Sequence, residues 1–154
     1  MAEKKSTGEL EKILKSTHAK DFGDYLSENE ASMANGGQGF SFYVKERITA
    51  KNLRLQEVFL RADISERYGY KLLSGEKKTR QRDVILRLCY AAEFTLEETQ
   101  KALRLYRMTP LYARVDRDAL LIIAFNTRPG SVLDVNRLLK ENGMEILRPC
   151  GVQE

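Results

Sequence analysis

The sequence predicts an all-α protein, and three observations carry that expectation. From Leu53 to Ala62, apolar side chains recur at the i, i+3 and i+4 spacing of one helix face. Ser65 and Gly75 enclose a further stretch and are residue types that begin and end helices. In the second half of the chain, a pattern of two consecutive helices occurs twice.

Residues 1–39 are expected to form an N-terminal arm that is partly helical or flexible. Two sets of apolar residues at helical spacing support the helical part: Leu10, Ile13 and Leu14, and then Phe22, Tyr25 and Leu26. The polar and glycine-rich run over residues 27–39 predicts a flexible joint. Two roles stay open for the arm: a helix that binds a partner or a second copy of the chain, and a loosely docked tail.

Three short helices are expected next. The first runs from Ser41, as its cap, to about Ala50, with an inner face from Phe42, Val44 or Lys45, and Ile48. The second covers residues 53–62, and the third covers residues 65–74 with Ser65 as its cap.

The third helix has one face that we expect to be packed and one that we expect to be exposed. Tyr68 and Leu72 lie four residues apart on the side of the Ser65 cap, so they should face the core. The other stripes can face outward. They consist of Glu66, Arg67, Tyr70, Lys71 and Ser74.

The second half of the chain repeats one design. An apolar helix over 83–92 precedes a helix over 96–105, where Thr95 and Glu98 form the pattern of a capping box. About 35 residues later, an apolar helix over 118–125 precedes one over 132–140 that starts after Ser131. Two such hairpins should stack side by side, and the 118–125 helix should need cover on nearly all sides. Residues 148–154, which begin with Arg148 and Pro149, are expected to form a tail.

The segment around Ser65 resembles a known family. Its residues at the relevant spacing are Ala62, Asp63, Ile64, Ser65, Leu72 and Gly75. They are similar to a lambda-repressor-like (Cro-type, XRE family) helix-turn-helix, over about residues 41–105. The resemblance implies a DNA-binding module whose second helix, here 66–74, enters the major groove. Two positions depart from the pattern: Leu55 replaces a common DNA-contacting Gln, and Gly69 replaces a core Ile or Val.

The predicted organisation therefore has four parts. They are an arm (1–39), a helix-turn-helix domain (40–108), a C-terminal helical hairpin extension (109–147) and a tail (148–154).

Positive charge is concentrated in the segment that carries the resemblance. Residues 1–44 contain 5 Lys and Arg against 7 Asp and Glu, residues 45–87 contain 12 against 6, and residues 88–154 contain 9 against 9. Such an excess is expected of a surface that binds phosphates. A solvated basic surface without a ligand is the alternative explanation.

The sequence thus favours a sequence-specific regulator that binds double-stranded DNA as a homodimer on an inverted repeat. The candidates for reading bases are Glu66, Arg67, Tyr70 and Lys71. The candidates for phosphate contact are Arg54, Ser65, Ser74, Lys77, Lys78, Arg80 and Arg82.

Enzymatic, metal-binding and membrane functions find no support in the sequence. One histidine, His18, and two distant cysteines, Cys89 and Cys150, provide no zinc spacing and no disulfide framework. No phosphate-loop, dinucleotide or nucleophile motif is present, so no cofactor is expected. No apolar run suits a membrane span or a signal peptide, which predicts a cytoplasmic protein.

A second hypothesis belongs to a different class. Leu55, Gly69 and the tyrosines Tyr68 and Tyr70 favour a protein-interaction adapter, such as an antitoxin-like or kinase-associated component, that keeps the fold without reading bases. Its partner surfaces would be the N-terminal arm and the C-terminal hairpin.

Overall fold

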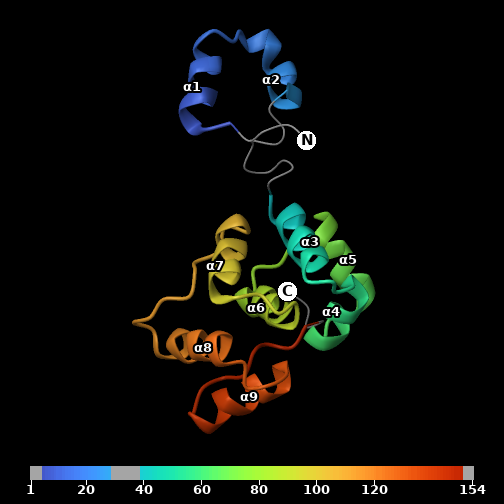
Figure 1. The fold of residues 1–154 in the computed structure, drawn as a ribbon, viewed down its shortest axis with the longest axis vertical. Helices are drawn as coiled ribbons and strands as arrows, with labels where there is room; N and C mark the ends of the chain where they lie inside the picture. The colour runs from blue at the N-terminus through green and yellow to red at the C-terminus, as the bar shows by residue number, and fades with distance from the viewer. Residues whose placement is uncertain (1–4, 29–38, 151–154) are drawn as a thin grey trace.

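The computed structural model describes residues 5–28 and 39–150, and every regular element in these two ranges is helical. The elements are α1 (Thr7–Lys15), the 3₁₀ helix η1 (Ala19–Asp21), α2 (Phe22–Glu28), α3 (Phe40–Ala50), α4 (Leu55–Ala62), α5 (Glu66–Ser74), α6 (Arg82–Ala91), α7 (Leu96–Leu105), α8 (Asp116–Thr127) and α9 (Val132–Glu141) (Figure 1). The all-α prediction is confirmed for this part of the chain. Most of the expected glycine-rich joint lies outside the described residues. Within the described ranges, no helix has the length and apolar character that crossing a bilayer requires.

The arm contains the helices that apolar spacing predicts. Ser6 begins α1 with a capping box in which Ser6 and Glu9 exchange hydrogen bonds. None of the residues of α1 is buried, and Leu14 remains 46% exposed. In the next segment Tyr25 is buried, whereas Phe22 is 57% exposed.

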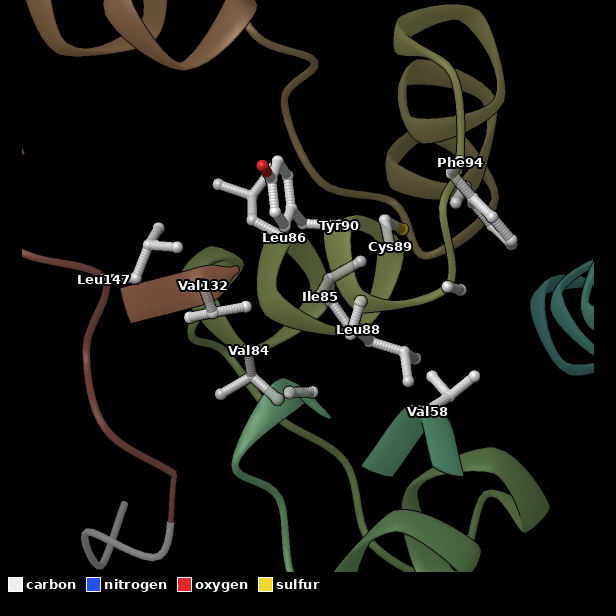
Figure 2. Close-up of a cluster of buried hydrophobic side chains, with 14 of the residues drawn as sticks. Val58, Val84, Ile85, Leu86, Leu88, Cys89, Tyr90, Phe94, Val132 and Leu147 are labelled. Carbon is white, nitrogen blue, oxygen red and sulfur yellow. The ribbon is translucent and has the colours of Figure 1, made fainter. Parts of the chain in front are cut away.

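Helix α6 is the centre of the bundle. Every residue from Val84 to Ala91 is buried, and the helix contacts α4, α7 and α9. Figure 2 shows its side chains pointing to several sides, toward Val58, Phe94, Val132 and Leu147. A helix with apolar side chains on several sides has to be enclosed in this way.

The expected cover of the 118–125 helix is present except at one position, Ile123. On α8, Leu121, Ala124 and Phe125 are buried, but Ile123 is 52% exposed. Leu120 and Ile122 are partly buried and pack against the core, and α7 and α9 lie on either side of α8 in Figure 1.

Helix α3 starts two residues earlier than predicted, because its N-cap is Gly39 and not Ser41. Gly39 occupies the N-cap position without a side-chain hydrogen bond, so Ser41 lies inside the first turn and is not the cap. Its buried face therefore consists of Phe40, Val44 and Ile48, and Phe42 is 41% exposed. The ring of Phe40 packs edge-on against Tyr106 at 4.7 Å between centroids.

The two hairpins α6–α7 and α8–α9 contain equivalent hydrogen bonds. The side-chain oxygen of Gln100 accepts from the N–H of Leu111 at 2.8 Å, and that of Asn136, 36 residues later, accepts from the N–H of Leu147 at 2.9 Å. The capping box of Thr95 and Glu98 is confirmed, and Ser131 and Asp134 form its counterpart.

The contacts between the hairpins are reciprocal. Arg82 at the start of α6 pairs with Asp118 of α8, and Arg117 of α8 pairs with Asp83 of α6 at 3.0 Å. The rings of Tyr90 and Phe125, also 35 residues apart, meet edge-on at 5.4 Å. These exchanged contacts hold the hairpins side by side, as the internal repeat predicts.

Residues 145–150 are not a free tail. The side chain of Leu147 is 1% exposed, and the N–H of Arg148 donates to Asp83 at 2.9 Å. The segment completes the second hairpin as Leu111 completes the first. The sequence shows no apolar periodicity there, because a single buried leucine anchors an irregular segment.

Candidate nucleic-acid interface

Helices α4 and α5 are joined by a tight turn. Asp63 ends α4 in the left-handed conformation, with φ of 56°, and the N–H of Ile64 donates back to Phe59 at 2.9 Å. The Oγ of Ser65 accepts from the N–H of Tyr68 at 3.2 Å and begins α5. Gly75 ends α5 with φ of 84°. The predicted cap and end of this helix are confirmed.

Gly69 lets α5 approach α4 closely. A Cβ atom at this position would lie 2.6 Å from the ring of Phe59, so the ring occupies the space that a branched side chain at position 69 would fill. The same ring packs edge-on against Tyr70 at 5.2 Å between centroids. Leu72 and Leu73 are buried, and Tyr68 packs partly buried against the core. These contacts hold one face of α5 against the bundle.

The opposite face of α5 is open to solvent. Glu66, Arg67 and Ser74 are exposed, and Tyr70 is 41% exposed despite its contact with Phe59. Lys71 is half-buried, with Nζ 3.8 Å from the carboxylate of Glu76. Among the described residues, no hydrogen bond or ion pair engages the guanidinium of Arg67. Of the four base-reading candidates, Glu66, Arg67 and Tyr70 are therefore exposed, whereas Lys71 is half-buried.

Gln56 is a residue that the sequence analysis did not single out. It lies exposed in the first turn of α4, and its Nε2 donates to Oε1 of Glu66 at 3.0 Å. This bond joins the starts of the two helices and orients the Glu66 carboxylate. The only signal in the sequence is a Gln beside Leu55, at the start of the predicted second helix.

The loop after α5 presents three positively charged side chains and is anchored to the bundle by a hydrogen bond. Lys77, Lys78 and Arg80 are exposed. Between them Thr79 is 5% exposed, and its N–H donates to the hydroxyl of Tyr106 at 3.0 Å. Because Thr79 anchors the loop, its exposed neighbours Lys77, Lys78 and Arg80 keep their positive side chains on the outer surface.

A groove of about 710 Å³ lies between this loop, the end of α5, the start of α3 and the end of α7. Its charged lining residues are Lys77, Lys78, Arg80 and Arg107. The described lining contains no carboxylate, so the groove is a cationic surface beside α5.

Arg82 does not belong to this surface. Its guanidinium pairs with Asp118, which is 3% exposed, and donates to the backbone oxygen of Thr109 at 3.2 Å. The expectation of phosphate contact for Arg82 is therefore not supported by its position. The acidic partner is 36 residues away in the sequence, and only tertiary packing brings it near.

The remaining phosphate candidates, Arg54, Ser65 and Ser74, are exposed residues. Arg54 is exposed at the N-cap of α4, and Ser65 is exposed at the N-cap of α5. The Oγ of Ser74 donates to the oxygen of Lys71 at 3.1 Å and accepts from the N–H of Glu76 at 3.3 Å, so its hydroxyl is engaged locally.

Side chains of the types that ligate metal ions do not gather at one place in residues 5–28 and 39–150. No group of three or more His, Cys, Asp or Glu side chains there could hold a metal ion. The thiol of Cys89 is fully buried, and burial raises its pKa far above the ordinary value. Comparisons of the chain with protein-family models, with curated proteins and with solved structures gave no match.

Proposed function

We propose that the chain is a sequence-specific DNA-binding regulator with a lambda-repressor-like helix-turn-helix formed by α3 to α7. The observation that carries the proposal is the two-sided character of α5. One face is packed through Gly69, Leu72 and Leu73. The other presents Arg67 in the first turn, and the exposed cations of the 76–80 loop follow the last turn. A helix presented in this way can enter a major groove while the flanking loop contacts the backbone.

The proposed roles follow from the chemistry of each side chain. The guanidinium of Arg67 can donate to both acceptors of guanine. Glu66, held by Gln56, can accept from the amino group of cytosine. Lys77, Lys78 and Arg80 would bind phosphates, because they are exposed on an anchored loop.

Binding-site selection from random double-stranded DNA tests the proposal. The selected duplex and an unrelated duplex of equal length are then titrated by fluorescence anisotropy at several salt concentrations. We expect Arg67→Ala to abolish the preference for the selected duplex at every salt concentration. Lys78→Ala should weaken binding to both duplexes and reduce the slope of log K against log salt by about 1.

Lys140→Ala provides the matched control, because it removes the same charge from an exposed position on α9. It should leave both duplexes bound as by the unchanged protein. Equal effects of Arg67→Ala and Lys78→Ala on every duplex would count against base reading.

The proposal includes a homodimer. A single module of this size contacts one half-site, so two copies would bind an inverted repeat with centres about 34–36 Å apart. Sedimentation of the protein with a single half-site and with the inverted repeat measures the stoichiometry. Two molecules on the repeat and one on the half-site are expected.

A protein-interaction adapter is the second candidate, and exposed apolar side chains favour it. Leu133 on α9 is 73% exposed and Ile123 on α8 is 52% exposed. Capture of one stoichiometric protein, together with no salt-dependent retention on DNA, would support the adapter in place of the regulator.

A further inference from the structure

A buried guanidinium joins the end of α4 to the end of the described chain. Arg87 on α6 is 3% exposed. Its three hydrogen bonds go to backbone carbonyl oxygens: Nη2 donates to Leu147 at 2.7 Å, Nε to Arg148 at 2.9 Å and Nη1 to Ala62 at 3.3 Å. A buried charge depends on such bonds, because it has lost its water. Two of the three acceptors belong to residues 145–150, which we name the C-terminal strap.

The strap is held by one buried apolar side chain and by hydrogen bonds, including those from the N–H of Arg148 to Asp83 and from its guanidinium to Gln81. Leu147 is its buried apolar anchor, and its N–H donates to Asn136. Arg117 donates to the backbone oxygens of Glu145 and Ile146, at 3.1 and 3.2 Å. A segment with one buried side chain opens at a lower free energy than a central helix such as α6.

The third acceptor of Arg87 lies at the turn that positions α5. Ala62 is the last residue of α4, and the left-handed Asp63, Ile64 and the Ser65 cap follow it directly. The guanidinium is planar and presents its donors at fixed angles. While the strap holds two of these donors, the third is fixed against the carbonyl of Ala62.

We propose that the C-terminal strap, acting through Arg87, positions the α4–α5 turn, and that opening of the strap weakens DNA binding by α5. The part of this proposal that concerns DNA binding rests on the proposed function. Arg87 is a positioning residue, because it lies buried away from the surface that would meet DNA. The strap therefore makes residues 145–150 a control point for a helix about 80 residues earlier in the sequence.

Two neighbouring substitutions in the strap test whether the strap positions the α4–α5 turn. Leu147→Ala removes the buried anchor, and Ile146→Ala shortens a side chain that is 42% exposed. Hydrogen exchange of the Ile64 N–H reports on the turn, and the Leu53 N–H, which forms the same kind of bond to Ile48 at the end of α3, provides the reference. We expect Leu147→Ala to accelerate exchange at Ile64 about tenfold or more and to leave Leu53 nearly unchanged. Ile146→Ala should change neither. If Leu147→Ala does not fold, Leu147→Val gives the same direction with a smaller change.

A second pair of proteins shows whether the effect passes through Arg87. In an Arg87→Leu background, Leu147→Ala should no longer change the exchange rate at Ile64 relative to Leu53, because the guanidinium that connects them is absent. Equal acceleration in both backgrounds would overturn the role of Arg87. Equal exchange at Ile64 in Leu147→Ala and Ile146→Ala would overturn the strap.

DNA titration with the selected duplex tests whether opening of the strap weakens DNA binding. Leu147→Ala should bind several-fold more weakly than Ile146→Ala at a temperature where both are folded, with an unchanged salt slope because no phosphate contact is removed. Equal affinities would overturn the link to DNA. If the unchanged protein binds no duplex, the proposed function fails, and the exchange rates at Ile64 still decide whether the strap positions the turn.

Discussion

The ring of Phe59 lies against the backbone of Gly69, at a distance that leaves no room for a Cβ atom. Gly69 is buried in the middle of α5, where glycine costs about 1 kcal/mol of helix stability relative to alanine. The cost is offset by close contact between α4 and α5, since Phe59 is 1% exposed and fills the gap. The glycine that departs from the family pattern is thus one half of a complementary pair.

Gly69→Ala should destabilise the protein despite the better helix propensity of alanine. Overpacking against Phe59 is expected to cost about 1–3 kcal/mol, measured by urea unfolding. Phe59→Leu, which frees space beside position 69, should make the added methyl group less costly. Additive effects of the two substitutions in the double variant would contradict the contact.

Arg82→Ala should lower the free energy of unfolding more than the loss of an exposed cation such as Lys78. It leaves Asp118 buried with the N–H of Tyr112 as its remaining partner in the described chain, at 2.9 Å. We expect a loss of about 3 kcal/mol in unfolding free energy. Lys78→Ala, on the exposed loop, should stay within about 0.5 kcal/mol of the unchanged protein. Similar unfolding midpoints for the two variants would refute the structural role of Arg82.

Glu98 should contribute stability that is lost in acid. Burial raises its pKa, but hydrogen bonds from Lys51, the N–H of Thr95 and Arg47 outweigh burial and hold the pKa below its ordinary value of 4.5. The unfolded chain therefore binds more protons in this range, so the contribution is complete above the ordinary pKa and declines as the pH falls through the folded-state pKa. Unfolding free energy of Glu98→Gln should fall less steeply below about pH 4.5 than that of the unchanged protein. Glu97→Gln, an exposed neighbour on α7, provides the control and should retain the full acid dependence.

Cys89 should react with thiol reagents only when the bundle unfolds. Its side chain is fully buried in α6, and burial raises its pKa, which disfavours the reactive thiolate. In a Cys150→Ser variant, the labelling rate under native conditions should follow the rate or population of global unfolding. Rapid labelling without unfolding would show that α6 is not the protected centre of the bundle.

Local sequence patterns were sufficient where a helix boundary depends on nearby residues. Ser65 and Thr95 form the predicted caps, and Gly75 takes the predicted left-handed conformation. The same reasoning placed the start of α3 wrongly, because Ser41 has the chemistry of a cap but Phe40 is drawn into the core against Tyr106. Burial of an aromatic ring outweighed the preference for a hydroxyl at the N-cap.

The candidate interface was predictable in part. The face of α5 and the exposed cations of the loop follow from helical periodicity and composition. Sequence patterns do not predict the hydrogen bond from Gln56 to Glu66 or the ion pair between Arg82 and Asp118. Each of these contacts depends on a side chain in another helix. Sequence spacing gives the direction in which a residue points along its own helix and gives no information about partners across the fold.

The sequence by itself determined the all-helical class, the repeated hairpin and the concentration of positive charge around α5, because helix propensity, capping and charge are local properties. Only the tertiary structure decided that α6 is the enclosed helix, that Phe59 fits Gly69, and that Arg87 joins the strap to the α4–α5 turn. The physical reason is that close packing and the hydrogen bonds of a buried charge depend on groups brought together from distant parts of the chain.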